Sequence, residues 1–235
     1  MSDANGAAPV VELEEVTKVY PQGDQQVDAL RGITLSVRSG EFAALSGPSG
    51  SGKTTALNLI GALDSPTSGT VRLEGADLGT LNRKELSHLR RDRIGFVFQA
   101  YNLLPVLSAY ENAEIVMAVQ GVAEAERRER VMELLARVGL EGMEHRRPSE
   151  LSGGQQQRVA IARAIAAEPA VVLADEPTAN VDSATAESLL EMMETLNRDN
   201  QVTFLFSTHD PRVMARARRL IRLVDGRIDN DEVRG

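Results

Sequence analysis

The chain has 235 residues, no cysteine and a formal net charge of −8. The lack of cysteine excludes disulfides and zinc sites built on thiolates, and the negative charge argues against a general nucleic-acid binder, whose phosphate contacts need clustered Lys and Arg. No stretch approaches the about 18 consecutive apolar residues of a membrane span, so work at a membrane would need a partner that supplies the spans.

Strands and one helix are predicted in the first hundred residues. Val11 and Leu13 alternate with acidic neighbours, and residues 33–37 alternate in the same way, as half-buried strands do. The apolar run 41–47 ends in glycine and leads into a helical stretch that continues to Leu63. Further strands are predicted at 70–75 and 94–99.

The pattern changes to helical in residues 100–168. Within 123–140 four apolar residues share one helix face, and Gly139 is a plausible stop. Those four residues are Val131, Leu134, Leu135 and Val138. After Pro169 strands return, at 171–175, 202–208 and 220–226, with a helix at 183–199. Alternating strands and helices favour a parallel sheet covered by helices, and the ends, about 1–8 and 230–235, are expected to be frayed.

A glycine-rich segment, "GPSGSGKT", follows the run 41–46 and precedes a helix. It fits G-x-x-x-x-G-K-[ST] at every fixed position, in the strand–loop–helix context that the motif requires. Its glycines let backbone N–H groups point at phosphate oxygens, and the helix start adds the positive end of a dipole. We expect Lys53 to reach the β- and γ-phosphates, Thr54 to ligate Mg²⁺ and Thr55 to bond the α-phosphate. The loop consists of Gly47, Pro48, Ser49, Gly50, Ser51, Gly52, Lys53 and Thr54.

Two carboxylates end the apolar run 171–174. Asp175 and Glu176 would therefore lie at the carboxyl edge of the sheet, where α/β folds bind ligands. Alone they would be two solvated acids opening a turn, but the phosphate loop changes their meaning. We expect Asp175 to anchor Mg²⁺ through water, and Glu176 to act as general base on the water that attacks the γ-phosphate.

A second glycine pair opens another helix, at "LSGGQQQR". Ser152 is a good N-cap, and Gly153, Gly154 and Gln155 begin a helix with apolar residues on one face. An ordinary capped helix is one interpretation. The other is a second anion site, because glycines at a helix start leave N–H groups open. A second site is useful when it serves the nucleotide of another copy.

Four segments, in this order and spacing, resemble the nucleotide-binding subunit of ATP-binding-cassette (ABC) transporters. They are "GPSGSGKT", "LSGGQQQRVAIARA", "VVLADEPTANVD" and "FSTHD". The resemblance implies an α/β fold: a P-loop NTPase core with a mixed sheet, an antiparallel β subdomain and an inserted α-helical subdomain. It implies one domain over 10–228, with the core and β subdomain in about 10–99 and 169–228 and the helical subdomain in about 100–168.

The resemblance also assigns single residues. Tyr20 falls where the family has an aromatic that stacks on adenine, and Gln99 where it has a glutamine that senses Mg²⁺ and the attacking water. Asp182 ends the loop that couples two sites, and His209 matches a histidine that contacts the γ-phosphate. Lys53 and Glu176 complete the implied catalytic set.

Partners follow from the same resemblance. Two copies would pack head to tail, so that each ATP lies between the phosphate loop of one and residues 151–158 of the other. A permease would hold this homodimer at the cytoplasmic face of the membrane, with no nucleic acid bound. We expect Tyr101, Leu103, Leu104 and Leu107 to form a groove for the permease, or to be structural core.

The subgroup most resembled is that of lipoprotein-release and macrolide-export ATPases. A cell-division or importer ATPase, and a soluble ABC ATPase without a transport role, are the alternatives.

Overall fold

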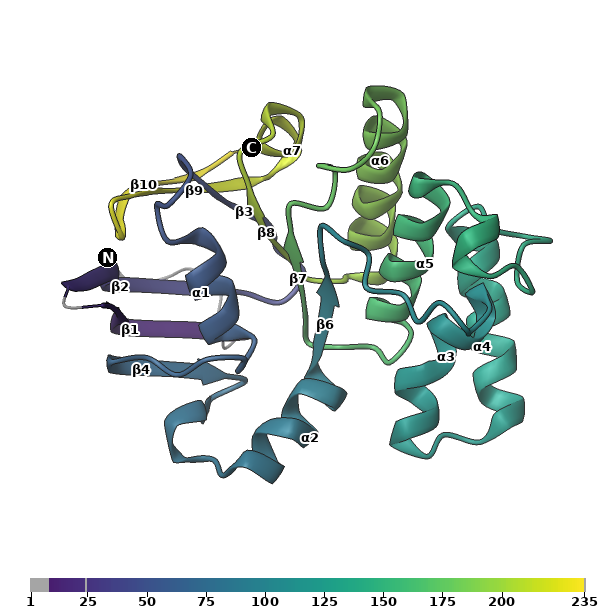
Figure 1. The fold of residues 1–235 in the computed structure, drawn as a ribbon, viewed down its shortest axis with the longest axis horizontal. Helices are drawn as coiled ribbons and strands as arrows, with labels where there is room; N and C mark the ends of the chain where they lie inside the picture. The colour runs from purple at the N-terminus through teal and green to yellow at the C-terminus, as the bar shows by residue number, and fades with distance from the viewer. Residues whose placement is uncertain (1–8, 24, 235) are drawn as a thin grey trace.

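The computed structural model describes residues 9–23 and 25–234, whose strands form two sheets (Figure 1). One is a four-stranded antiparallel sheet in the order β2-β1-β4-β5. Its strands are β1 (Val11–Gln22), β2 (Gln25–Val37), β4 (Ser68–Leu73) and β5 (Ala76–Asp77). β1 extends beyond its alternating start because a bulge at Glu14 and Glu15 shifts the register and pairing then resumes.

The other sheet has the order β10-β9-β3-β8-β7-β6. Neighbours from β9 to β6 pair in parallel, and β10 pairs antiparallel with β9, so the sheet is mixed. Its strands are β3 (Phe42–Ser46), β6 (Ile94–Val97), β7 (Val171–Asp175), β8 (Phe204–Thr208), β9 (Arg219–Val224) and β10 (Arg227–Val233). The predicted α/β class with a mixed sheet and an antiparallel sheet is confirmed.

Helices connect the strands. They are α1 (Lys53–Ile60), α2 (Arg83–Arg93), α3 (Ala109–Gln120), α4 (Glu124–Arg137), α5 (Gly153–Ile165), α6 (Ser183–Asn200) and α7 (Pro211–Arg216), with 3₁₀ turns at Leu78–Thr80 and Pro148–Glu150. In the part of the chain that the structure describes, none of them has the length and apolar character of a membrane span. The division of the chain into core and helical subdomain stays a prediction.

The six-stranded sheet separates two hydrophobic clusters. Ala43 and Leu45 of β3 pack with α1 and the antiparallel sheet, whereas Phe42 and Ala44 pack with α3, α4, α5 and α6. Side chains of β7 and β8 alternate in the same way. Since successive strand residues point to opposite faces, α1 covers one face of the sheet and α5 and α6 cover the other (Figure 1).

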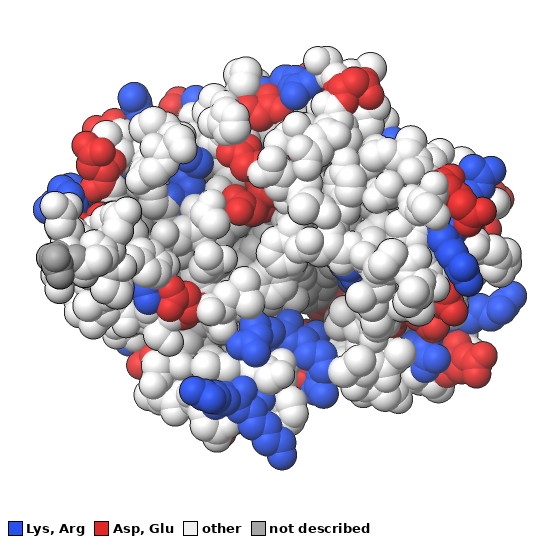
Figure 2. All heavy atoms as spheres, viewed as in Figure 1, with Lys and Arg blue, Asp and Glu red and all other residues white. Residues whose placement is uncertain are grey.

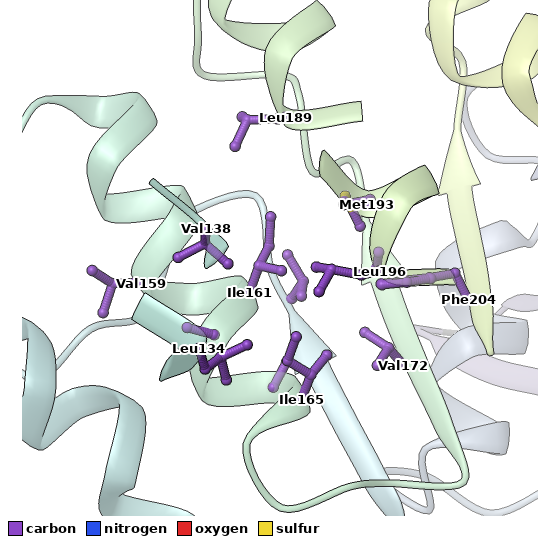
Figure 3. Packing of buried hydrophobic residues seen from close by; sticks show 14 of the residues in the cluster. Leu134, Val138, Val159, Ile161, Ile165, Val172, Leu189, Met193, Leu196 and Phe204 are labelled. Carbon is purple, nitrogen blue, oxygen red and sulfur yellow. The ribbon is translucent and has the colours of Figure 1, made fainter. Parts of the chain in front are cut away.

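The second cluster fixes α5 in place. Figure 3 shows Ile161 and Ile165 of α5 among Leu134 of α4, Leu196 of α6 and Val172 of β7. Each of these side chains is at most 9% exposed. Burial on this scale contributes about 1.5–3 kcal/mol per side chain, so α5 is held firmly against β7.

Some elements differ from the expectations. The helix predicted to reach Leu63 ends at Ile60, and the strand predicted at 202–208 begins at Phe204. The prediction that the C-terminal end, 230–235, is frayed is wrong for most of these residues. β10 pairs with β9, and Asp231 forms an ion pair with Arg219 at 2.7 Å. The frayed N-terminal end falls on 1–8, outside the described residues.

Candidate functional site

The loop between β3 and α1 needs glycine where its backbone is crowded. A Cβ on Gly47 would lie 2.1 Å from the Leu223 carbonyl oxygen, and one on Gly52 would lie 2.5 Å from the Ala29 carbonyl oxygen. Both residues also have positive φ, 146° and 101°. Neither position accepts a side chain. The two glycines therefore let the loop pack closely on its neighbours and lead directly into the first turn of α1, whose N–H groups have no partner within the helix.

Lys53 places a buried positive charge in this loop. Its side chain ammonium donates to the carbonyl oxygens of Gly47 at 2.8 Å and Pro48 at 2.9 Å, and the residue is 8% exposed. No described carboxylate forms an ion pair with it. A buried ammonium without a counter-charge favours an anionic ligand, and phosphate oxygens meet that need.

Two other features of the loop suit a phosphate ligand. The Ser51 hydroxyl oxygen is buried without a hydrogen-bond partner among the described residues. Pro48, Ser49 and Gly50 lie exposed at the tip of the loop. An orphaned hydroxyl next to an exposed backbone turn is rare in a closed protein core, and a bound ligand explains it.

Asp175 lies against the start of α1. The Thr54 hydroxyl donates to its two carboxylate oxygens at 3.2 and 3.3 Å. Thus the last residue of β7 meets the motif threonine, although the two are far apart in the sequence. The structure brings together two of the three residues that are predicted for the Mg²⁺ site, whose third member is Gln99.

Glu176 and His209 are in direct contact. The Glu176 Oε1 atom lies 2.6 Å from His209 Nδ1, and the Thr208 hydroxyl donates to Glu176 Oε2 at 3.2 Å. The Glu176 side chain is 17% exposed and that of His209 is 73% exposed. Glu176 has φ 45°, an unusual conformation for a residue other than glycine, and such strain gathers at functional sites.

A polar network behind this pair was not found from the sequence. The Thr178 hydroxyl donates to Asp210 Oδ2 at 2.7 Å, and the Asp210 N–H donates at 2.9 Å to Thr208, which bonds Glu176. Bonds from Arg212 lower the pKa of Asp210 to about 2. The signal was present in "THDP", where an aspartate precedes a proline as in a capped helix start.

Tyr20 lies beside the first turn of α1. Its hydroxyl donates to Asp64 at 2.7 Å, its ring centroid lies 4.9 Å from the Lys18 ammonium, and the Thr55 side chain is adjacent. Burial, and then the bond to Asp64, raises the pKa of Tyr20. This location is compatible with adenine stacking, which stays a prediction.

Gln99 follows β6 at the same edge of the sheet. Its side chain is exposed, and its carbonyl oxygen accepts a bond from the Asn180 amide at 2.8 Å. The segment after β6 is therefore tied to the segment before α6. Asn180 is a contact that the sequence analysis did not anticipate.

Ser152 and Gln155 form a reciprocal cap at the start of α5. The Ser152 hydroxyl accepts from the Gln155 N–H at 3.3 Å, and the Gln155 side chain accepts from the Ser152 N–H at 2.9 Å. A Cβ on Gly153 would lie 2.9 Å from the Tyr101 hydroxyl, and one on Gly154 would lie 2.3 Å from the Thr185 methyl. Close packing is therefore one reason for glycine at both positions.

Asp182 caps α6 next to this helix start. It accepts from the Thr185 N–H at 3.0 Å and from the Thr185 hydroxyl at 2.6 Å. These bonds, first that from the hydroxyl, lower the pKa of Asp182. Because the Thr185 methyl touches Gly154, the cap of α6 and the start of α5 form one unit.

Within one chain, the predicted site residues fall into two groups. The phosphate loop, Asp175, Glu176 and His209 meet at the carboxyl edge of the sheet, with Tyr20 beside α1. Residues 152–155 and Asp182 instead begin α5 and α6, which cover the face of the sheet opposite α1 (Figure 1).

The groove expected at Tyr101, Leu103, Leu104 and Leu107 stays a prediction. A pocket of about 430 Å³ opens between α2, α3, α5 and β6, and none of those four residues lines it. Leu103 packs on the hydrophobic core, and the Tyr101 hydroxyl donates to the Asn180 carbonyl oxygen at 3.1 Å.

Comparison with known families agrees with this geometry. Residues 30–179, more than half of the chain, match the family described as ABC transporter. The chain belongs to that family. As a member of this family, it is an ATP-binding protein and an ATPase.

Two relatives match the cassette over nearly their whole length. The lipoprotein-releasing system ATP-binding protein LolD of Anaeromyxobacter dehalogenans is 50% identical over 226 residues, which are 96% of this chain and 95% of that protein. An uncharacterized ABC transporter ATP-binding protein of Thermotoga maritima is 47% identical over 226 residues, 96% of each.

Other relatives are much longer. The macrolide export ATP-binding/permease protein MacB of Hyphomonas neptunium is 47% identical over 223 residues, which are 95% of this chain and 34% of that protein. The chain thus spans about a third of the length of the macrolide export relatives.

Solved structures show the same fold. An ATP-binding cassette solved as a dimer in a post-hydrolysis state, bound to ADP and Pi, superposes with TM-score 0.87 at 43% identity, over 96% of this chain and 99% of that chain.

Proposed function

We propose that the chain is the motor subunit of an export-type transporter and acts as a head-to-tail homodimer around two ATP molecules. Some relatives are named ATP-binding proteins and others ATP-binding/permease proteins. The second kind of name supports a permease as the partner that holds the cassette at the cytoplasmic face of the membrane. Lipoprotein release or macrolide-type export is the transport class that the relatives favour.

The observation that carries the dimer is the separation of the two glycine-rich helix starts. α1 and α5 cover opposite faces of one sheet, and no hydrogen bond among the described residues joins residues 152–155 to the phosphate loop of the same chain. A second copy, related by a two-fold axis, would bring its own α5 start to this loop and receive the same in return. A relative solved with ADP and Pi is a dimer, which supports this arrangement.

The residues present fit a bound Mg²⁺. A threonine hydroxyl and a carboxylate are ligands that this ion accepts, and Thr54 and Asp175 are already within hydrogen-bond distance. Among the described residues no group of three or more acidic or histidine side chains forms a metal site, as expected for an ion that keeps waters and phosphate oxygens. When bound, Mg²⁺ would neutralise charge on the β- and γ-phosphates.

Hydrolysis follows from the placement of Glu176 and His209. Glu176 would take a proton from a water, whose oxygen attacks the γ-phosphorus while the bond to the bridging oxygen of ADP breaks. Lys53 would balance charge on the phosphates, and His209 would contact the γ-phosphate while orienting Glu176 through the 2.6 Å contact. The products are ADP and inorganic phosphate.

The test is a Glu176→Gln variant. The amide keeps the shape of the side chain but accepts no proton, so hydrolysis should fall by roughly 10²-fold or more while ATP still binds. We expect Mg-ATP to convert the variant to a stable dimer in size-exclusion chromatography with light scattering. A variant that hydrolyses ATP like the parent, or that stays monomeric with saturating Mg-ATP, would contradict the proposal.

A further inference from the structure

Tyr20 is held by two charged neighbours to which the sequence analysis gave no role. The Tyr20 hydroxyl donates to Asp64 Oδ2 at 2.7 Å, and the Lys18 ammonium lies over the Tyr20 ring, 4.9 Å from its centroid. Lys18 also forms an ion pair with Asp64 Oδ1 at 2.7 Å. Each of the three side chains therefore contacts the other two, and we call this group the Tyr20 clamp.

The charged pair of the Tyr20 clamp is partly shielded from solvent. The side chain of Lys18 is 12% exposed and that of Asp64 is 32% exposed, so water and salt screen the pair less than they screen a surface ion pair. Burial acts to raise the pKa of Asp64, but the bonds from Lys18 and Tyr20 outweigh it and lower this pKa. The carboxylate therefore stays charged at neutral pH and keeps both bonds.

Asp64 is anchored to the helix that begins with the phosphate loop. Its N–H donates to the Asn58 carbonyl oxygen at 3.3 Å, and its Oδ1 atom accepts from the Ser65 N–H at 2.7 Å. Asn58 belongs to α1, which starts at Lys53. A carboxylate fixed at the end of α1 thus sets where the Tyr20 ring lies relative to the phosphate loop at the start of α1.

Lys18 determines which face of the Tyr20 ring is free. An ammonium is attracted to the π electrons of an aromatic ring and here occupies one face of it. A purine that stacks on Tyr20 must therefore use the opposite face. Because immobilising a flexible side chain on binding costs affinity, a ring that is already held binds the purine more tightly.

We propose that Asp64 and Lys18 are positioning residues for the base of the nucleotide, and that they hold the Tyr20 ring with one face open to a purine before ATP binds. The inference rests on the proposed function, since it assumes that ATP binds at the phosphate loop with its adenine on Tyr20. Asp64 acts through the Tyr20 hydroxyl, and Lys18 acts through the ring face that it covers.

The experiment separates the base from the phosphates. ADP carries both and pyrophosphate carries only phosphates, so a defect in the Tyr20 clamp should weaken the binding of ADP alone. The full chain is titrated with Mg-ADP in a calorimeter, and the Kd for pyrophosphate is measured from its competition with ADP. Tyr20→Ala should weaken ADP binding roughly tenfold or more, because the stacking of the base on an aromatic ring is lost.

Asp64→Ala should weaken ADP binding roughly fivefold and leave pyrophosphate binding within about twofold of the parent, because the ring must then be immobilised on binding. Unchanged pyrophosphate binding also shows that the variant is folded. In a Tyr20→Phe chain, the same Asp64→Ala change should alter ADP binding by about twofold or less, since phenylalanine has no hydroxyl for the carboxylate to hold. Lys18→Met should weaken ADP binding roughly threefold.

Two control variants exclude general effects of lost charge. Asp77→Ala removes a carboxylate of the same antiparallel sheet that accepts the Gly79 N–H at 2.8 Å and does not contact Tyr20. Lys84→Met removes an exposed ammonium of α2, over which Figure 2 shows Lys and Arg gathered. Both controls should bind ADP and pyrophosphate like the parent.

Each contrary result has its own meaning. Equal losses of ADP and pyrophosphate binding in Asp64→Ala, or an undiminished effect of this change in the Tyr20→Phe chain, would overturn the inference, because Asp64 would not act through Tyr20. Unchanged ADP binding in Asp64→Ala would refute the positioning role alone. Unchanged ADP binding in Tyr20→Ala would refute the adenine contact on which the inference rests, and the Glu176→Gln test of the proposed function would be unaffected.

Discussion

Gly154 has two physical reasons to be glycine. The sequence suggests open N–H groups for an anion, and the structure adds a close approach, since a Cβ at this position would lie only 2.3 Å from the Thr185 methyl. That methyl has little freedom, because the Thr185 hydroxyl is bonded to Asp182 at 2.6 Å. The packing reason acts in the isolated chain, before any nucleotide binds.

We expect Gly154→Ala to destabilise the chain by about 1–3 kcal/mol through overpacking, although alanine in a helix otherwise gains up to about 1 kcal/mol over glycine. Adding Thr185→Ser removes the methyl and keeps the hydroxyl bond, so the double variant should equal or exceed the parent. Urea unfolding of the parent, the two single variants and the double variant measures these differences in stability. Increased stability of the single Gly154→Ala variant would show that the crowding is unimportant.

Asp210 makes stability depend on pH. Its pKa of about 2, against 3.8 normally, arises from Arg212 first and then Thr178, and its side chain is 12% exposed. A depressed pKa stabilises the fold above pH 3.8, and this stabilisation is lost as pH falls towards 2. The shift corresponds to about 2 kcal/mol.

In urea unfolding, Asp210→Asn should be less stable than the parent by about 2 kcal/mol at neutral pH, and the gap should shrink as pH falls below 4. The control is Asp229→Asn, whose partner Arg222 lies 3.6 Å away with both side chains more than half exposed. That variant should show little difference at any pH. A gap for Asp210→Asn that stays constant down to pH 2.5 would refute the account.

At the scale of elements, α5 connects the capped helix start to the turn after β7, which contains Glu176. Gln157 is fully buried and its amide donates to the Pro177 carbonyl oxygen at 2.7 Å, one residue after Glu176. Its own side-chain oxygen has no partner in the described structure. A side-chain hydrogen bond from α5 therefore holds the turn after β7.

We expect Gln157→Leu to change stability by about 1 kcal/mol or less, because the lost bond and the removed orphan oxygen offset each other. The turn that holds Glu176 would loosen, so kcat should fall roughly tenfold with an unchanged KM for ATP. Gln156→Leu is the control, since its amide bonds the Leu151 carbonyl instead. Equal kcat for both variants would remove the positioning role of Gln157.

The elements also show what the sequence could and could not predict. Strands β3, β7 and β8 are apolar runs buried on both faces, and such runs are visible in any sequence. α2 has no buried residue, so the hydrophobic period gave no signal, although the Asn82–Glu85 capping box did mark its start. β10 is mostly exposed and forms only because β9 offers it an edge.

At the scale of the whole molecule, motif spacing predicts which residues belong to the site, and the order of strands in the sheet decides which of them are in contact. Glu176 contacts His209 because β7 and β8 are neighbours, a pairing that chain order does not specify. The contact of Tyr101 with Gly153 likewise depends on the fold of a loop with two residues of positive φ. The roles of the site residues themselves stay predictions.

The proposed site shared by two copies predicts that two differently defective chains complement each other. Lys53→Met should prevent the phosphate loop of a chain from binding ATP, while the start of α5 in that chain stays intact. Ser152→Asp should do the reverse, because aspartate caps a helix as well as serine does but repels a partner's phosphates. With Glu176→Gln in both chains, neither variant alone should dimerise on addition of Mg-ATP.

Mixing the two variants should restore dimers, since a mixed pair keeps one complete site: the loop of the Ser152→Asp chain and the α5 start of the Lys53→Met chain. Light scattering should then find ATP-dependent dimers only in the mixture, with about one bound nucleotide per mixed pair. If each site were built within one chain, the mixture would behave as the sum of two inactive proteins. Circular dichroism of each variant alone ensures that this comparison is between folded chains.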